Sequence, residues 1–186
     1  MTDGPNDIRI DDLKDPVLTP MQKMVLDGFA GVEVEFTENA VLGEAKERTG
    51  LSDFGPDDFR ERLAVWCQAV DEDADLGPMG QVRFFGDMVR YAVNRLRFHD
   101  LIKRHPQILN DEIRKPIIIA GLPRSGTTHL LNLIAAYTRL RSLPYWESLE
   151  PIPDAGVAPG PKEQDPRYVK CAGEYQMFGQ FAPLLK

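Results

Sequence analysis

The residues whose types and spacing could do chemistry are gathered in one stretch, PIIIAGLPRSGTTHLLNLIA, at positions 116–135. An apolar, β-branched run leads into a turn bounded by Gly121 and Gly126, and an apolar helix is predicted to follow. In such a turn, successive backbone N–H groups converge with the positive end of the helix dipole and form a cradle for an anion. The stretch therefore predicts a site for a phosphate-like group.

The turn departs from the loop of nucleotide triphosphatases at one position. Its pattern is G-x-x-x-x-G-T-T, with Thr127 in place of the usual lysine and Thr128 at the Ser/Thr position. Arg124 is the only cation inside the turn, and a guanidinium can bind two oxygens of a phosphate or sulfate in a planar fork. No apolar run ending in Asp follows to hold Mg²⁺. The loop 121–128 therefore favours an anionic group that is transferred without an obligatory metal.

These residues resemble those of a known family. The hexapeptide Pro-Arg-Ser-Gly-Thr-Thr at 123–128 is similar to the 5′-phosphosulfate-binding loop of sulfotransferases that use 3′-phosphoadenosine 5′-phosphosulfate (PAPS). The flanking sequences, TGLSDFGPDDFRERL upstream and LPYWESLEPIP downstream, resemble the bacterial, particularly actinobacterial, sulfotransferase-like branch. The resemblance covers roughly residues 37 to 155 and is strongest over 116 to 155.

The resemblance implies an enzyme that moves a sulfuryl group from PAPS to an acceptor hydroxyl or amine. The cofactor-binding residues it implies are Arg124, Ser125, Gly126, Thr127 and Thr128. Arg124 is also the expected catalytic residue, and its permanent charge limits it to electrostatic stabilisation. The acceptor is expected to be a small molecule or of glycolipid type. No metal is expected, and the oligomeric state is left open.

Two parts of that family's site do not appear after the loop, namely the Arg/Ser pair for the 3′-phosphate and the acceptor-activating base. His129 is the only histidine beyond residue 105, and its position directly after Thr128 predicts a packing or solvent-facing role. Glu147 is the other acid–base candidate, although a carboxylate bonded to nearby backbone is the favoured interpretation. Two alternatives therefore remain open: a non-catalytic remnant of a sulfotransferase and, less favoured, a P-loop kinase or NTPase.

An α/β fold is expected around the loop. The run IIIAG at 117–121 predicts a parallel strand buried on both faces, and LRSL at 140–143 a neighbouring strand in a right-handed βαβ unit. A helix is expected to join them over 128–140, and 144–165 to form a long loop at the sheet edge. Two strands are too few for such a sheet, so the chain is expected to be an N-terminal fragment with an incomplete P-loop-type parallel sheet.

A helical N-terminal region is expected before that sheet. Thr37 and Gly50 are a predicted N-cap and C-cap, and a helix over 78–104 carries an apolar stripe at helical spacing. Another helix is expected to begin at Asp165 and Pro166. The predicted domains are a mobile or loosely structured N-terminus (1–36), a helical region (37–110) and the first part of a sulfotransferase-type α/β domain (111–186).

Composition narrows the class of protein. A hydrophobic fraction of 42% and a charged fraction of 27% in 186 residues are typical of a globular chain. The acidic start is not a secretory signal, no apolar run approaches the roughly 18 residues of a membrane span, and a cytoplasmic location is expected. Cys67 and Cys171 lack metal or redox spacing, so free thiols are expected.

Charge is distributed unevenly along the chain. The net charge of −7 divides into −12 for residues 1–75 (7 Lys+Arg against 19 Asp+Glu) and +5 for residues 76–186 (15 against 10). The basic half holds the candidate anion loop. A pI of about 5.0, with no basic cluster interleaved with aromatic residues, argues against a nucleic-acid partner.

Overall fold

The computed structural model describes residues 12, 14–154, 156–157 and 160–182, and over these residues the chain consists of helices, turns and irregular segments without a β-strand. The α-helices are α1 (Pro20–Gly28), α2 (Glu38–Thr49), α3 (Arg60–Glu72), α4 (Pro78–Arg104), α5 (Thr127–Ala135), α6 (Tyr145–Leu149) and α7 (Pro166–Phe181). Short 3₁₀ turns occupy Asp57–Phe59, Pro106–Asn110 and Lys162–Gln164. Residues 1–11 and 13 of the predicted mobile N-terminus lie outside the described residues.

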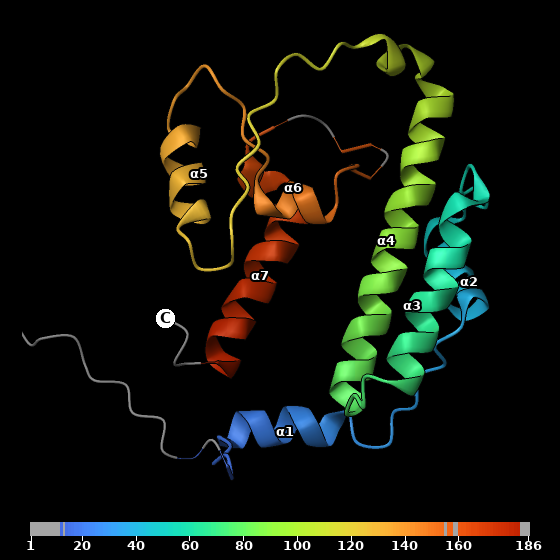
Figure 1. The fold of residues 1–186 in the computed structure, drawn as a ribbon, viewed down its shortest axis with the longest axis vertical. Helices are drawn as coiled ribbons and strands as arrows, with labels where there is room; N and C mark the ends of the chain where they lie inside the picture. The colour runs from blue at the N-terminus through green and yellow to red at the C-terminus, as the bar shows by residue number, and fades with distance from the viewer. Residues whose placement is uncertain (1–11, 13, 155, 158–159, 183–186) are drawn as a thin grey trace, which may run out of the picture.

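The hydrophobic core lies in the unit formed by α2, α3 and α4. α3 and α4 run in opposite directions, and α2 packs against both (Figure 1). Every described residue that is buried and apolar comes from residues 36–96: Phe36, Val41, Leu42, Ala45, Phe54, Leu63, Cys67, Val70, Met88, Val89, Ala92 and Leu96. The predicted apolar stripe of α4 therefore supplies one wall of this core.

Local capping signals explain where the helices begin and end. The Thr37 hydroxyl accepts the backbone N–H of Ala40 at 3.1 Å, and Gly50 closes α2 with a left-handed backbone, as predicted. α4 begins at Pro78 and ends at Arg104, just before the sequence His-Pro. The Asp165 carboxylate accepts the N–H of Arg167 at 2.9 Å and caps α7, also as predicted.

A second unit is formed by α6 and α7. The Arg167 guanidinium stacks over Trp146 at 4.8 Å from the ring centroid, pairs with Asp165 at 2.7 Å and donates to the carbonyl of Glu150 at 2.9 Å. This unit attaches to α4 through Asn94, whose amide donates to the carbonyl of Leu149 at 2.7 Å. At its far end, the Gln22 amide of α1 donates to the carbonyl of Phe181 at 2.8 Å.

The predicted α/β fold with a P-loop-type parallel sheet is wrong for the residues that the structure describes. Neither 117–121 nor 140–143 is a strand, and Ile117 and Ile118 are 62% and 81% exposed rather than buried on two faces. A strand exists only when a neighbour pairs with its backbone N–H and C=O groups, and these segments have none over the described residues. An apolar, β-branched composition cannot supply that neighbour.

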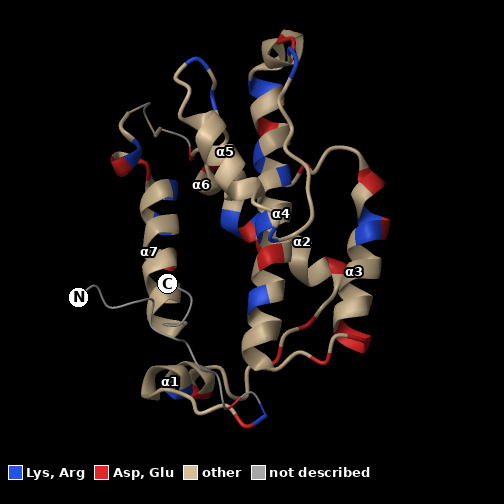
Figure 2. Cartoon of the chain, turned by 60° about the vertical axis from the view of Figure 1, so that its left-hand side comes forward, with Lys and Arg blue, Asp and Glu red and all other residues tan. Residues whose placement is uncertain are grey.

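The elements after the loop also differ from those predicted. α5 ends at Ala135 instead of residue 140, because the N–H groups of Tyr137 and Leu140 turn back to Ile134 and Tyr137 at 3.0 Å. The predicted long loop at 144–165 contains α6 and a 3₁₀ turn. α5 carries no Lys, Arg, Asp or Glu, whereas charges of both signs cover α4 (Figure 2). Over the described residues, no helix combines the length and apolarity that a bilayer span requires.

Candidate functional site

The predicted anion loop is a tight turn that leads directly into α5. The N–H and hydroxyl of Ser125 both donate to the carbonyl of Leu122, at 3.2 and 2.6 Å, and close the turn. A Cβ at Gly121 would lie only 2.8 Å from Ser125 Oγ and from the methyl carbon of Thr127, so the turn leaves room for glycine alone. Gly126 begins α5 with φ of +88°, which favours glycine.

The N-terminus of α5 presents free backbone donors. No side chain caps it, and among the described residues the N–H groups of Gly126, Thr127 and Thr128 find no protein acceptor. The first N–H groups of a helix lack partners within the helix and carry the positive end of its dipole. N–H groups of this kind at the start of a nine-residue helix can bind an anionic group.

Arg124 stands at the apex of this turn. Its backbone has φ of +66°, a left-handed conformation that is uncommon for a residue other than glycine. The side chain is exposed and makes no ion pair with the residues that the structure describes, unlike most arginines of the chain. An exposed guanidinium without a carboxylate partner among the described residues, on a residue two positions before Gly126, is available to an incoming anion.

The five predicted loop residues lie together, but their groups differ in availability. The Ser125 N–H and hydroxyl proton are used within the turn, so this residue shapes the loop in the observed geometry. Thr128 is exposed and Thr127 is half-buried, and neither hydroxyl has a protein partner among the described residues. The donors open to a ligand are thus the N–H groups of 126–128, the two threonine hydroxyls and the Arg124 guanidinium.

The two acid–base candidates occupy different settings. His129 is exposed in the first turn of α5, in agreement with a solvent-facing role. Glu147 lies on α6 rather than in a loop, is only 18% exposed, and pairs with Arg141 at 2.5 Å. Its carboxylate is thus held by a guanidinium, and the expected bond to nearby backbone is replaced by an ion pair. Cys67 and Cys171 are both free thiols, and burial raises the pKa of Cys67.

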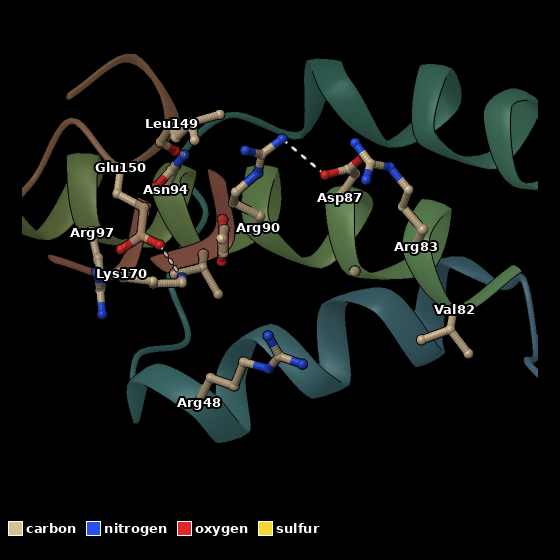
Figure 3. A pocket seen from close by; sticks show the side chains of 13 residues that line it. Arg48, Val82, Arg83, Asp87, Arg90, Asn94, Arg97, Leu149, Glu150 and Lys170 are labelled. Carbon is tan, nitrogen blue, oxygen red and sulfur yellow. Dashed lines mark hydrogen bonds and ion pairs between the residues drawn. The ribbon is translucent and has the colours of Figure 1, made fainter. Parts of the chain in front are cut away.

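The structure contains a second polar site, on α4, which none of the sequence motifs above predicts. Five residues at intervals of four, three, four and three along α4 face one cavity, and they are Arg83, Asp87, Arg90, Asn94 and Arg97 (Figure 3). This spacing is a helical stripe like that of the apolar core residues, but on another face of α4. The repeat was present in the sequence, and a search for polar as well as apolar periodicity would have found it.

Comparison with solved structures places the chain beside two bacterial enzymes. Sulfotransferase STF1 from Mycobacterium tuberculosis superposes with a TM-score of 0.67 at 28% identity, over 79% of this chain and 40% of that one. Sulfotransferase STF9 from Mycobacterium avium superposes with a TM-score of 0.67 at 31% identity, over 80% of this chain and 38% of that one. The described fold resembles that of bacterial sulfotransferases. The resemblance found in the sequence is thereby confirmed.

This sulfotransferase-like chain spans about 40% of the length of the solved proteins that it matches. No family model matches it, and no curated protein matches it by sequence. Both neighbours are named as sulfotransferases, so the motif Pro-Arg-Ser-Gly-Thr-Thr and the structural similarity agree on the class of protein. The motif and the structural similarity agree even though the described part of the chain contains no sheet.

Proposed function

We propose that the chain takes part in sulfuryl transfer from PAPS to an acceptor hydroxyl or amine, with the 5′-phosphosulfate held by the loop 121–128. The observation that carries the proposal is the start of α5, where three N–H groups without an acceptor among the described residues follow Arg124, whose guanidinium has no ion pair with those residues. Similarity to two sulfotransferases favours a phosphosulfate over other anions. The acceptor is proposed to be a small molecule or of glycolipid type.

Each loop residue has a defined task in this proposal. The N–H groups of Gly126, Thr127 and Thr128 bind the anionic oxygens, and the two threonine hydroxyls donate further hydrogen bonds. Ser125 keeps the turn closed through its bonds to Leu122. When bound, PAPS would supply the sulfuryl group: the bond from sulfur to the bridging oxygen would break, a bond from sulfur to the acceptor oxygen or nitrogen would form, the acceptor proton would pass to solvent, and adenosine 3′,5′-bisphosphate would leave.

Arg124 stabilises the charge that gathers on the leaving side. Its guanidinium remains protonated at all accessible pH values, so it attracts the negative bridging oxygen but donates no proton. Preorganised positive groups near a developing charge commonly account for 10²–10³ in rate, or about 3–4 kcal/mol. Arg124 therefore carries the largest expected share of catalysis among the loop side chains.

A binding experiment with two nucleotides tests the donor. The protein is titrated with adenosine 3′,5′-bisphosphate and, separately, with ATP and Mg²⁺, while its unfolding temperature is followed. A ligand at 100 times its dissociation constant stabilises the folded state by about 2.7 kcal/mol. Stabilisation by the bisphosphate is expected, and stabilisation by ATP–Mg²⁺ alone would support the kinase or NTPase alternative instead.

Substitution of Arg124 tests the role of the cation. Arg124→Ala is expected to weaken bisphosphate binding about tenfold or more, since hydrogen bonds to charged groups contribute about 1.5–3 kcal/mol. In a sulfuryl-transfer assay with labelled PAPS it is expected to lose about 10²–10³ in rate, with an unchanged unfolding temperature. Arg114→Ala is the matched control, because Arg114 is 80% exposed and pairs only with Glu112 among the described residues.

The outcomes separate the proposed enzyme from a non-catalytic remnant. Binding that depends on Arg124, together with transfer that depends on Arg124, supports the enzyme. Binding without detectable transfer to a panel of phenols, amines and sugars supports the remnant. Transfer that stays within a few-fold of wild type in Arg124→Ala contradicts the role given to the guanidinium.

A further inference from the structure

A cavity of about 290 Å³ lies between α3 and α4, and it shares no lining residue with the polar cavity of Figure 3 or with the loop 121–128. Two sets of four residues line it, each at intervals of three, one and three: Phe59, Arg62, Leu63 and Trp66 from α3 and the turn before it, and Met88, Tyr91, Ala92 and Arg95 from α4. This spacing places each set on one face of its helix. Because three of the eight residues are aromatic, we call it the aromatic cavity.

The floor of the aromatic cavity is apolar, and its rim carries two rings. Leu63, Met88 and Ala92 are buried and belong to the hydrophobic core. Above them, Trp66 is half-buried and Tyr91 is 55% exposed, with their ring centroids 6.0 Å apart and their planes tilted by 41°. Aromatic rings pair with another ring in offset or edge-to-face arrangements. This part of the cavity therefore suits a flat aromatic group.

The two ends of the aromatic cavity differ in chemistry. α3 and α4 run in opposite directions (Figure 1), so residues that lie one turn apart on α3 face residues one turn apart on α4 in reverse order. Arg62 and Arg95 meet at one end, where both pair with Asp58, at 3.1 and 2.9 Å. Trp66 and Tyr91 meet at the other end. The cavity thus has a cationic end and an aromatic end.

The cationic end has unused hydrogen-bond donors. Arg95 donates from Nε to the carbonyl of Phe54 and from Nη2 to Pro56 and Asp58, but its Nη1 has no acceptor among the described residues. Arg62 is 71% exposed and uses only Nη2, for Asp58. Two guanidiniums therefore share one carboxylate, and the lining over the described residues contains no Asp or Glu. This end favours an anion.

We infer that the aromatic cavity binds a small aromatic carboxylate, with its ring against Trp66 and Tyr91 and its carboxylate at Arg62 and Arg95. Guanidiniums bind carboxylates through parallel N–H groups in one plane. Positions 62 and 66 lie about 6 Å apart along the helix axis, a span that suits a single ring with the carboxylate attached directly to it. This binding does not depend on the proposed sulfuryl transfer.

The test is an NMR titration of the whole chain with sodium benzoate, following the indole N–H signals. The chain has two tryptophans, and Trp146 lies outside the aromatic cavity, under the Arg167 guanidinium, so its signal is an internal control. We expect a saturable shift of the Trp66 signal and none of the Trp146 signal. Benzamide has the ring without the charge and is expected to bind about tenfold more weakly, since hydrogen bonds to charged groups are the stronger ones. Sodium acetate, which has no ring, is expected to give no saturable shift.

Two substitutions test the two ends separately. Arg62→Gln is expected to weaken benzoate binding about tenfold and to leave benzamide binding unchanged. Arg48→Gln is the matched control, because Arg48 lies in α2, outside the aromatic cavity, and likewise pairs with a carboxylate four residues earlier, that of Glu44. Tyr91→Ala removes one ring and is expected to weaken benzoate and benzamide alike, by about tenfold. Arg124→Ala is expected to leave benzoate binding unchanged.

The alternative outcomes contradict distinct parts of the inference. Benzamide that binds as tightly as benzoate, or benzoate binding that is unaffected in Arg62→Gln, would remove the role of the carboxylate. A saturable shift of the Trp66 signal with acetate would remove the role of the ring. Equal shifts of both indole signals, or shifts that stay linear in benzoate concentration, would overturn the site itself. Unfolding temperatures of the variants verify that each of them is folded.

Discussion

The unit α2–α4 and the segment 111–143 differ in what stabilises them. α2–α4 contains all of the buried apolar residues that the structure describes, and its helices meet along apolar stripes. Over 111–143 no residue is buried, and Leu122 and Leu133 are exposed by 80% and 59%. The region with the buried core lacks the anion motif, and the region with the motif has no buried residue.

This contrast shows that the sequence pattern for binding an anion and the sequence pattern for stable packing lie in different parts of the chain. The anion loop can be recognised because it needs a few residue types at a fixed spacing, all within eight positions. Stability requires contacts between elements that are distant in the sequence. A clear motif therefore does not guarantee that the elements around it are packed.

The largest expected difference between the two regions comes from leucine truncation. Leu96 is fully buried in α4, so Leu96→Ala is expected to lower the free energy of unfolding by about 2–5 kcal/mol. Leu133 on α5 is mostly exposed, so Leu133→Ala should change it by no more than about 0.5 kcal/mol. Urea denaturation of both variants checks this, and equal losses would show that α5 is packed in solution.

Replacing Gly43 or Gly121 with alanine is expected to give the next largest difference in stability between the two regions. Gly43→Ala is expected to stabilise the chain by about 0.8–1 kcal/mol, because alanine favours a helix and its Cβ has open space. Gly121→Ala forces Ser125 and Thr127 apart but should alter the free energy of unfolding by no more than about 0.5 kcal/mol.

The Gly121→Ala effect should appear locally instead. Amide signals of 121–128 are expected to move in a ¹⁵N spectrum, and bisphosphate binding should weaken. Gly43→Ala should leave those signals in place. A large loss of global stability in Gly121→Ala would mean that the loop belongs to the cooperative core.

The smallest expected effect is a pH dependence in the α6–α7 unit. The hydrogen bond and charge of Arg167 hold the pKa of Asp165 below its ordinary value of about 3.9. A lowered carboxyl pKa contributes stability above the unfolded-state value, and this stability is lost as pH falls through the folded-state value. α7 should therefore loosen only below about pH 4.

Asp165→Asn isolates that charge effect, because asparagine still caps a helix. The stability difference between wild type and Asp165→Asn should be constant near neutral pH and shrink below about pH 4. Circular dichroism melts across this range measure it. A difference that persisted at lower pH would assign the contribution to the hydrogen bond geometry rather than to charge.

The bounds of several helices could be predicted because their signals are local. Thr37, Gly50, Pro78 and Asp165 act through hydrogen bonds and backbone angles within a few residues, and all four mark helix ends in the structure. The grouping of Arg124 with Ser125–Thr128 was likewise a matter of adjacent positions. Their roles toward PAPS stay predictions.

The sheet could not be predicted correctly because strand pairing is not local. Ile117–Ile119 have the composition of a buried strand, but composition does not provide a partner. The cavity was missed for a related reason. Arg90 and Asn94 look like an ordinary solvated face of α4 until Leu149 and Lys170 are brought against them.

The exposed, irregular segment between α4 and α5 should be sensitive to proteolysis. Its backbone is irregular from 111 to 126 and its side chains are nearly all exposed, which are the properties that proteases require of a substrate. Arg114 and Arg124 both lie in this stretch, whereas the arginines of α4 are protected by helical hydrogen bonds. Trypsin should therefore divide the molecule first beside the anion loop, and release the α2–α4 unit with its core intact.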